Sequence, residues 1–266
     1  MSEHILEIKN VSKSFKLPRT NLFEKRSYIK ALNNVSLNIE KGQIVGIVGE
    51  SGSGKSTLGR IIVKLLEADS GQIIYNGTDI TRLSHKEFAP YRKDIQMVFQ
   101  NAYSSLNPNK TIGWLLKESL DINTDLSDSQ KKIRVDEVFD MVGLKNTLKT
   151  RYPGELSGGE RQRAVIALAI MLEPKIIVAD EAVSALDVSV SAQILNLMAE
   201  LRDKLDLSYI FISHDLSVVN YISDYIAIIQ NGEIVEQGQS DEVFRNPETN
   251  YAKQLLEGTF IYNLPS

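Results

Sequence analysis

Short runs of mainly apolar residues are the clearest pattern along the chain. They lie at 44–48, 95–99, 176–179 and 209–213, and isoleucine is common in all of them. Runs of this length and composition predict buried strands. Segments with helical spacing separate these runs, and such alternation of strands and helices predicts a mainly parallel α/β core.

Further strands are indicated by alternation of apolar and polar residues at 5–9 and 31–39. Segment 16–30 lacks any period, so we expect a loop there. Asn-Gly pairs at 76–77 and 231–232 follow apolar runs, and this dipeptide favours the tight turn of a β-hairpin. The early part of the chain is therefore expected to form a β layer beside the core.

Helical spacing of apolar residues indicates where the chain forms helices. These segments are 58–66, 112–120, 130–142, 157–172, 194–205 and 241–256, the last interrupted near Pro247. Ile133, Val138, Met141 and Val142 give 130–142 a loose apolar stripe, as in an amphipathic helix. The helices between 100 and 164 read as an insertion into the α/β core.

A glycine-rich segment joins the strand at 44–48 to the next helix. Its residues match the phosphate-binding pattern G-x-x-x-x-G-K-[ST]: Gly49, Glu50, Ser51, Gly52, Ser53, Gly54, Lys55, Ser56 and Thr57. In this context backbone N–H groups and the helix N-terminus hold phosphate oxygens. Lys55 is suited to reach the terminal phosphates and Ser56 to hold Mg²⁺. The alternative, a plain turn, does not need a lysine and serine at these places.

Other strands also end in residues that suit phosphate chemistry. Asp180 and Glu181 close one strand, His214 follows another, and Gln100 follows a third. Ligands of α/β sheets bind outside the carboxyl ends of strands. We expect Asp180 to hold Mg²⁺, Glu181 to take a proton from water, and His214 to bind a phosphate. The alternative for the two acids is a solvated strand end, and the alternative for His214 is a structural histidine.

A second predicted helix begins with two glycines, Gly158 and Gly159, which allow a ligand to approach the backbone closely. Ser157 and Glu160 are spaced as a capping box, which predicts that the helix begins at Ser157. This end is a second candidate phosphate-binding surface, and we expect it to serve the nucleotide of another copy.

Composition sets further limits. The chain has 266 residues, 42% of them hydrophobic and 24% charged, which is typical of a globular protein. A net charge of −4 gives no support for nucleic-acid binding, and the absence of cysteine excludes disulfides and thiolate metal sites. The beginning of the chain does not have the pattern of a signal peptide. The longest apolar run, 164–172, is shorter than the roughly 20 residues that span a bilayer, so we expect membrane association through a partner.

With these motifs in order, the chain resembles the ATP-binding cassette (ABC) ATPases. The segment at 49–57 resembles the Walker A motif, and 176–180 resembles Walker B, followed by Glu181 as the catalytic glutamate. Gln100 resembles the Q-loop glutamine and His214 the switch histidine. The family signature corresponds to Leu156, Ser157, Gly158, Gly159 and Glu160, and the D-loop to Ser184, Ala185, Leu186 and Asp187.

This resemblance implies a fold and further residue roles. The fold would be a P-loop NTPase core with an N-terminal antiparallel β layer and an inserted α-helical subdomain. It implies one ABC domain over 1–266, with a core at 1–99 and 165–240, a helical subdomain at 100–164 and an extension at 241–266. Phe15 lies where the family stacks an aromatic ring on adenine, with Tyr28 as the alternative. Gln100 would join Ser56 and Asp180 around Mg²⁺.

Finer resemblance is to the ATPase subunits of oligopeptide, dipeptide and nickel importers. It rests on segments 98–101, 105–108, 151–153, 183–190 and 212–219, and on the tail at 246–251. Some positions depart from that pattern. Glu160 stands for the usual glutamine, Ala102 and Ala182 stand where proline is frequent, and the usual His-Pro-Tyr reads Thr249-Asn250-Tyr251.

The resemblance implies ATP and Mg²⁺ as cofactors and an ATPase that powers an importer of oligopeptides or dipeptides. The implied partners are a second cassette, identical or homologous, two transmembrane permease subunits and an extracytoplasmic solute-binding protein, with no nucleic acid. The chain would then lie at the cytoplasmic face of the membrane, with permease docking near 101–108. Import of nickel or a metal chelate, export, and a non-transport ABC ATPase are the alternatives.

Overall fold

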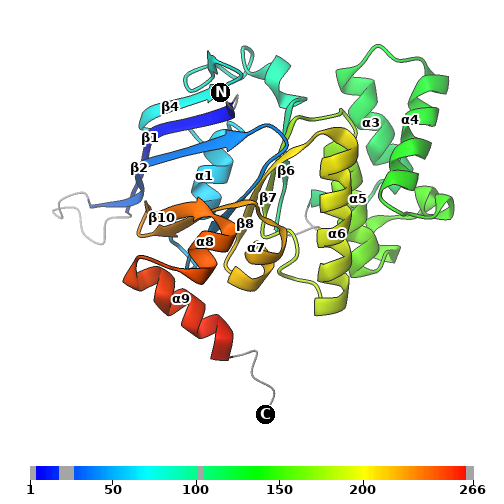
Figure 1. The fold of residues 1–266 in the computed structure, drawn as a ribbon. Helices are drawn as coiled ribbons and strands as arrows, with labels where there is room; N and C mark the ends of the chain where they lie inside the picture. Colours follow the sequence, from blue (N-terminus) through cyan, green and yellow to red (C-terminus); the bar gives the residue numbers. More distant parts are fainter. Residues whose placement is uncertain (1–3, 18–26, 101–104, 262–266) are drawn as a thin grey trace. The chain divides into compact units, whose positions relative to one another are not determined.

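The computed structural model describes three stretches of the chain: residues 4–17, 27–100 and 105–261. The chain divides into two compact units, the first made of residues 1–88 and 210–266 and the second of residues 89–209 (Figure 1). The expected boundaries of a core, a helical subdomain at 100–164 and an extension stay a prediction. Over the described residues, no helix has both the length and the apolar character needed to cross a membrane.

An antiparallel sheet of four strands forms one layer of the first unit. Its strands are β1 (His4–Lys16), β2 (Tyr28–Glu40), β4 (Ser70–Tyr75) and β5 (Thr78–Asp79), in the order β2-β1-β4-β5. Buried Ile8 pairs with Leu37 on one side and Ile73 on the other. The expected β layer and the hairpin at 76–77 are confirmed. The expected loop at 16–30 is wrong at both ends, because cross-strand pairing extends β1 to Lys16 and starts β2 at Tyr28, and residues 18–26 lie outside the described ones.

The second group of strands in this unit carries the functional loop. These strands are β3 (Ile44–Val48), β8 (Ser208–Ser213), β9 (Tyr225–Gln230) and β10 (Glu233–Gln239), in the order β10-β9-β3-β8. Strand β3 is buried along its whole length and pairs in parallel with β9. β9 and β10 form the expected hairpin around Asn231-Gly232.

Among its described residues, the first unit also has the helices α1 (Lys55–Ile62), α7 (Leu216–Ile222), α8 (Ser240–Arg245) and α9 (Asn250–Ile261). α7 packs on β3, and α9 packs on α7. The break between α8 and α9 contains Pro247, as expected. The expected helix at 58–66 is wrong beyond Ile62, because Lys64 adopts a left-handed conformation that ends the helix (φ 60°).

The second unit combines two parallel strands with helices. The strands are β6 (Ile95–Val98) and β7 (Ile176–Asp180), and the helices are α3 (Ile112–Asn123), α4 (Asp128–Met141), α5 (Gly158–Ile170) and α6 (Val188–Leu205). Short 3₁₀ helices lie at η1 (Ala89–Arg92), η2 (Asn146–Thr150) and η3 (Pro153–Glu155). α5 packs against β6 and against α3, α4 and α6. The strands and helices of both units confirm the expected α/β class.

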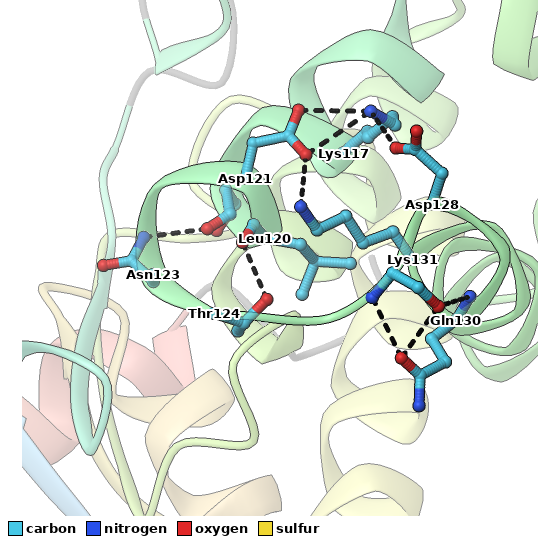
Figure 2. Close-up of polar contacts among 10 residues, drawn as sticks. Lys117, Leu120, Asp121, Asn123, Thr124, Asp128, Gln130 and Lys131 are labelled. Carbon is cyan, nitrogen blue, oxygen red and sulfur yellow. Dashed lines mark hydrogen bonds and ion pairs between the residues drawn. The ribbon is translucent and has the colours of Figure 1, made fainter.

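A small network of ion pairs joins α3 to α4 (Figure 2). Lys117 Nζ lies 3.3 Å from Asp121 and 3.0 Å from Asp128, while Lys131 Nζ lies 2.8 Å from Asp121. The Lys131 and Lys117 ammonium groups lower the pKa of the Asp121 carboxyl. Because Lys117, Asp121 and Asp128 are open to water, the network sets the geometry of the connection more than its stability.

The apolar stripe expected on α4 is only partly buried. Val138 is fully buried, whereas Ile133 is 58% exposed. Ile133 stays exposed because α4 turns only part of its apolar stripe toward α3 and α5, and the spacing of a loose stripe does not fix which side chains pack.

We therefore expect Ile133→Gln to change the free energy of unfolding by less than about 0.5 kcal/mol, as an exposed position allows. Val138→Ala on the same helix should cost about 2 kcal/mol, because it leaves a cavity. Urea denaturation of both variants checks the pair. Equal costs would contradict the packing described for α4.

Candidate functional site

The loop that follows β3 is shaped by its neighbours in the first unit. Gly54 is the N-cap of α1, with a left-handed backbone (φ 110°) and no side-chain cap. The Ser53 carbonyl accepts a hydrogen bond from the Gly232 N–H (2.9 Å), and the Gly232 carbonyl accepts one from the Asn33 N–H (2.8 Å). Because no side chain caps α1, the N–H groups of its first turn can hold an anion.

Glycine is required in this loop by close approach as well as by conformation. A Cβ on Gly54 would lie 2.3 Å from the Ala31 carbonyl oxygen, and a Cβ on Gly49 would lie 2.1 Å from the Ile229 carbonyl oxygen. Both contacts are to backbone of neighbouring strands, which cannot move aside cheaply. The loop therefore lies directly on the two strand layers of its unit.

Lys55 is buried inside the loop that it follows. Its ammonium donates to the Gly49 carbonyl (2.6 Å) and the Glu50 carbonyl (2.8 Å), and lies 3.5 Å from Ser53 Oγ. A buried cation needs such acceptors. A phosphate group would offer the same ammonium charged oxygens in place of neutral carbonyls.

Two more expected site residues belong to the first unit. His214 is exposed and lies between β8 and α7, directly before the Asp215 N-cap, whose carboxylate accepts from the Ser217 N–H at 2.9 Å. β8 is the neighbour of β3 in the sheet order. Phe15 lies near the end of β1, is 39% exposed, and has the Lys13 ammonium 5.8 Å from its ring centre. Its open ring has room for a stacking partner.

In the second unit, the ends of β6 and β7 bring three expected residues to one edge. The strands are parallel and Val98 pairs with Ala179. Gln100, two residues past Val98, therefore leaves the sheet beside Asp180 and Glu181. Asp180 is buried, Glu181 is half-buried and Gln100 is exposed.

The backbone at Glu181 has a feature that the sequence did not indicate. Glu181 has a φ of 54°, which is unusual for a residue with a side chain and typical of functional sites. Its carbonyl accepts hydrogen bonds from the Ser184 N–H (3.2 Å) and the Ser184 hydroxyl (3.0 Å). The segment that follows thus holds the backbone of Glu181 in this conformation.

The segments 156–160 and 184–187 meet in the second unit. Asp187 is the N-cap of α6 and accepts from the Val190 N–H at 2.9 Å and the Ser189 hydroxyl at 2.7 Å, which lowers its pKa. A Cβ on Gly159 would lie 2.8 Å from the Val190 side chain. The start of α5 therefore packs closely on the start of α6.

The capping box expected at the start of α5 is confirmed. Glu160 Oε2 accepts hydrogen bonds from the Ser157 N–H (2.9 Å) and hydroxyl (2.7 Å), and the Glu160 N–H donates back to Ser157 Oγ at 3.3 Å. The Ser157 N–H and hydroxyl lower the pKa of the Glu160 carboxyl. A glutamate can make this box as well as a glutamine can, and it adds a charge that the helix N-terminus favours.

The expected site residues thus fall into two sets. The loop at 49–57, Phe15 and His214 belong to the first unit, and the remaining ones to the second. Sequence reasoning missed Tyr251, whose hydroxyl accepts a hydrogen bond from the Glu50 N–H at 3.2 Å. No local signal indicates a contact between residues so far apart in the chain.

Comparisons with known proteins match these features. The sequence model of the ABC transporter family matches residues 32–184. The chain is 48% identical over 241 residues to the dipeptide transport ATP-binding protein DppF of Haemophilus influenzae, which covers 91% of this chain and 74% of that protein. It is 45% identical over 253 residues to the oligopeptide transport ATP-binding protein OppF of Streptococcus mutans, which covers 95% of this chain and 80% of that protein.

Solved structures agree. The ATP-binding cassette MJ0796, in a dimeric post-hydrolysis state with ADP and phosphate, superposes with a TM-score of 0.77 at 29% identity, over 88% of this chain and 98% of that one. CbiO1 of Clostridium perfringens, part of the complex cbiONQ, gives a TM-score of 0.80 at 25% identity, over 98% of this chain and all of that one. The fold is that of an ABC ATPase with a P-loop core, as expected. The chain belongs to the ABC transporter family.

The lowered pKa of Glu160 predicts a pH dependence. The folded-state pKa lies below the ordinary value of 4.5, so the charged carboxylate stabilises the folded chain above that pH. This contribution is lost as the pH falls through the lowered value.

Glu160→Gln should therefore be less stable than the wild type by about 0.5 kcal/mol at neutral pH, and this difference should shrink as the pH falls through the lowered pKa of Glu160. Urea denaturation at neutral and acidic pH measures it. Glu118→Gln, on α3 of the same unit, serves as the control. If the difference in unfolding free energy between Glu160→Gln and the wild type does not change with pH, the charged Glu160 carboxylate does not stabilise the start of α5.

Proposed function

We propose that this chain is the ATP-hydrolysing subunit of a membrane transporter that imports dipeptides or oligopeptides. The observation that carries the proposal is identity of 44–48% to dipeptide and oligopeptide transport ATP-binding proteins over more than nine-tenths of the chain. No finding favours the alternatives of nickel or metal-chelate import, of export, or of an ATPase without a transport role.

ATP would bind first at the loop after β3. The N–H groups at the start of α1 and the Lys55 ammonium would hold the terminal phosphates. The ammonium has three N–H donors, so it could bind phosphate oxygens while the Gly49 carbonyl holds it in place, and the loop would offer a site that is already shaped. Phe15, or Tyr28 as the alternative, would stack on the base.

Mg²⁺, when bound, would neutralise phosphate charge. Ser56, Asp180 and Gln100 offer a hydroxyl, a carboxylate and an amide oxygen, and oxygens of these types suit Mg²⁺. Buried Asp180 fits this role because an ionised carboxylate in such surroundings favours a cation. Among the described residues, no group of three or more His, Cys, Asp or Glu could hold a metal by protein ligands alone, so the triphosphate would supply ligands too.

Hydrolysis would use Glu181 and His214. Water attacks the γ-phosphorus, the bond from this phosphorus to the bridging oxygen of ADP breaks, and the Glu181 carboxylate takes the proton from water. The His214 imidazole would donate a hydrogen bond to the γ-phosphate. The left-handed backbone at Glu181 supports this role, because such strain is costly where it has no use.

A second cassette, identical or homologous, would complete the nucleotide site. The start of α5, with Ser157, Gly158 and Gly159, would contact the γ-phosphate held by that partner. Two permease subunits would hold the chain at the cytoplasmic face of the membrane, and a solute-binding protein would deliver the peptide. Of the expected docking segment 101–108, residues 101–104 lie outside the described ones.

Replacing Glu181 tests the chemistry. Glu181→Gln should keep nucleotide binding but slow hydrolysis by about 100-fold or more, because the amide cannot take a proton. Phosphate release and binding of Mg-ATP measure the two properties, and Glu200→Gln on α6 is the control. Hydrolysis at the wild-type rate would show that another group activates the water.

Transport is tested in the host cell. Deletion of the gene should abolish uptake of a labelled dipeptide or tetrapeptide and leave uptake of radioactive nickel unchanged, and the wild-type gene, but not Glu181→Gln, should restore it. The tagged chain should carry two multi-span proteins and a second ATPase from gently solubilised membranes. Loss of nickel uptake instead would select the metal importer, and capture of ribosomes without membrane proteins would overturn transport.

A further inference from the structure

The peptide bond between Gly49 and Glu50 is held at both of its polar ends. Its carbonyl, on Gly49, accepts the Lys55 ammonium at 2.6 Å. Its N–H, on Glu50, donates to the Tyr251 hydroxyl at 3.2 Å. The orientation of this peptide therefore depends on a side chain of α9, about two hundred residues further along the chain.

Tyr251 is itself fixed in place. Its side chain is 8% exposed, and its neighbours on the buried face of α9, Ala252 and Leu256, are also buried, with the helix packed on α7. Burial raises the pKa of the Tyr251 hydroxyl. The hydroxyl therefore stays protonated and neutral in the working pH range, and its oxygen remains an acceptor for the Glu50 N–H.

The start of α9 is anchored by a carboxylate from β10. Glu236 accepts hydrogen bonds from the Glu248 N–H (2.9 Å), the Thr249 N–H (2.9 Å) and the Thr249 hydroxyl (2.6 Å). Thr249 Oγ1 in turn accepts from the Ala252 N–H at 3.2 Å, which is the bond of an N-cap. Burial acts to raise the pKa of Glu236, but the hydrogen bonds from Thr249 and Glu248 outweigh it and lower that pKa, so the anchor is charged.

These contacts form one continuous path from Glu236 through the Thr249 cap and Tyr251 to the loop. Both ends of the path lie in the first unit, because β10 belongs to the hairpin whose turn residue Gly232 donates to the Ser53 carbonyl. The tail is thus attached to the same strand pair that supports the loop from the other side. Such an arrangement limits rotation of the Gly49–Glu50 peptide and, with it, the place of the Lys55 ammonium.

We propose that Tyr251 is a positioning residue for nucleotide binding, and that α9 acts as a brace that holds the Gly49–Glu50 peptide in the orientation that presents Lys55 to phosphate. This inference rests on the proposed role of the loop at 49–57. Tyr251 need not touch the nucleotide. Its loss should weaken affinity because the loop must then be ordered by the ligand itself.

The test compares nucleotide binding and turnover in full-length variants. Tyr251→Phe keeps the ring and removes the hydroxyl, so it should raise the dissociation constant of fluorescent, N-methylanthraniloyl-labelled ADP with Mg²⁺ about three- to tenfold, the equivalent of one hydrogen bond. The kcat at saturating ATP should change less than about twofold, because the chemical groups are untouched. The Glu50 amide should also exchange its hydrogen faster, as measured by NMR.

Two controls separate this effect from general damage. Tyr225→Phe removes a hydroxyl from β9, and Gln254→Ala changes an exposed side chain of α9. Both should bind the labelled ADP as the wild type does. A Tyr251→Phe variant whose dissociation constant matches that of these controls would overturn the proposal, whatever its melting temperature.

Thr249→Val provides a second route, because it removes the cap without touching the Tyr251 hydroxyl. It should weaken binding in the same direction, and the double variant should lose less than the sum of the two, since both act through one contact. Wild-type affinity in a Thr249→Val variant whose Glu50 amide exchanges its hydrogen faster would also overturn the proposal, because the contact would then be loosened without effect on binding. Lys55→Ala tests the proposed nucleotide site itself. If Lys55→Ala binds the labelled ADP as the wild type does, the site is wrong. If Lys55→Ala loses binding while Tyr251→Phe keeps the wild-type dissociation constant, only the role of α9 as a brace is refuted.

Discussion

The close approach of backbone to backbone around Gly49 and Gly54 is the constraint on which the nucleotide loop depends. Each glycine lies so near a carbonyl of a neighbouring strand that a methyl group would not fit. The loop is therefore not a free turn but a segment pressed between β2, the turn of the β9–β10 hairpin and its own helix. A loop held from outside keeps its shape without a side-chain cap on α1, so the start of the helix is not covered by a capping side chain.

In the second unit, charged residues that cap helices hold the functional segments in place. Glu160 and Asp187 each place a carboxylate at the start of a helix, and the N–H and hydroxyl groups there lower both pKa values. The two helix starts also touch, through Gly159 and Val190. The segments that would meet a partner's nucleotide are thus fixed as a pair. Glu160, which departs from the usual glutamine, fits this scheme because its role here is to cap the helix.

Much of the fold and of the candidate site was predictable from the sequence where the cause is local. Apolar runs gave the buried strands, the Asn-Gly pairs gave the hairpins, and the Ser157 to Glu160 spacing gave the cap, since each depends on residues a few positions apart. The exposed Ile133, the end of α1 at Ile62 and the left-handed Glu181 were not predictable. They depend on which face packs, or on backbone forced by distant contacts. The contact from Tyr251 to Glu50 is the extreme case, because the two residues are 201 positions apart in the chain.

The tail differs in sequence from the importer subunits that the chain resembles, yet α9 still places Tyr251 against the loop. Where their pattern reads His-Pro-Tyr, this chain has Thr249-Asn250-Tyr251. Thr249 supplies a hydroxyl that both donates to Glu236 and caps α9, so the helix starts at a defined residue. A defined start sets the rotation of the helix, and rotation decides whether Tyr251 faces the loop or the solvent. The capping chemistry can therefore vary as long as some side chain sets that start, whereas the tyrosine hydroxyl has no substitute that both fits its buried place and accepts the Glu50 N–H.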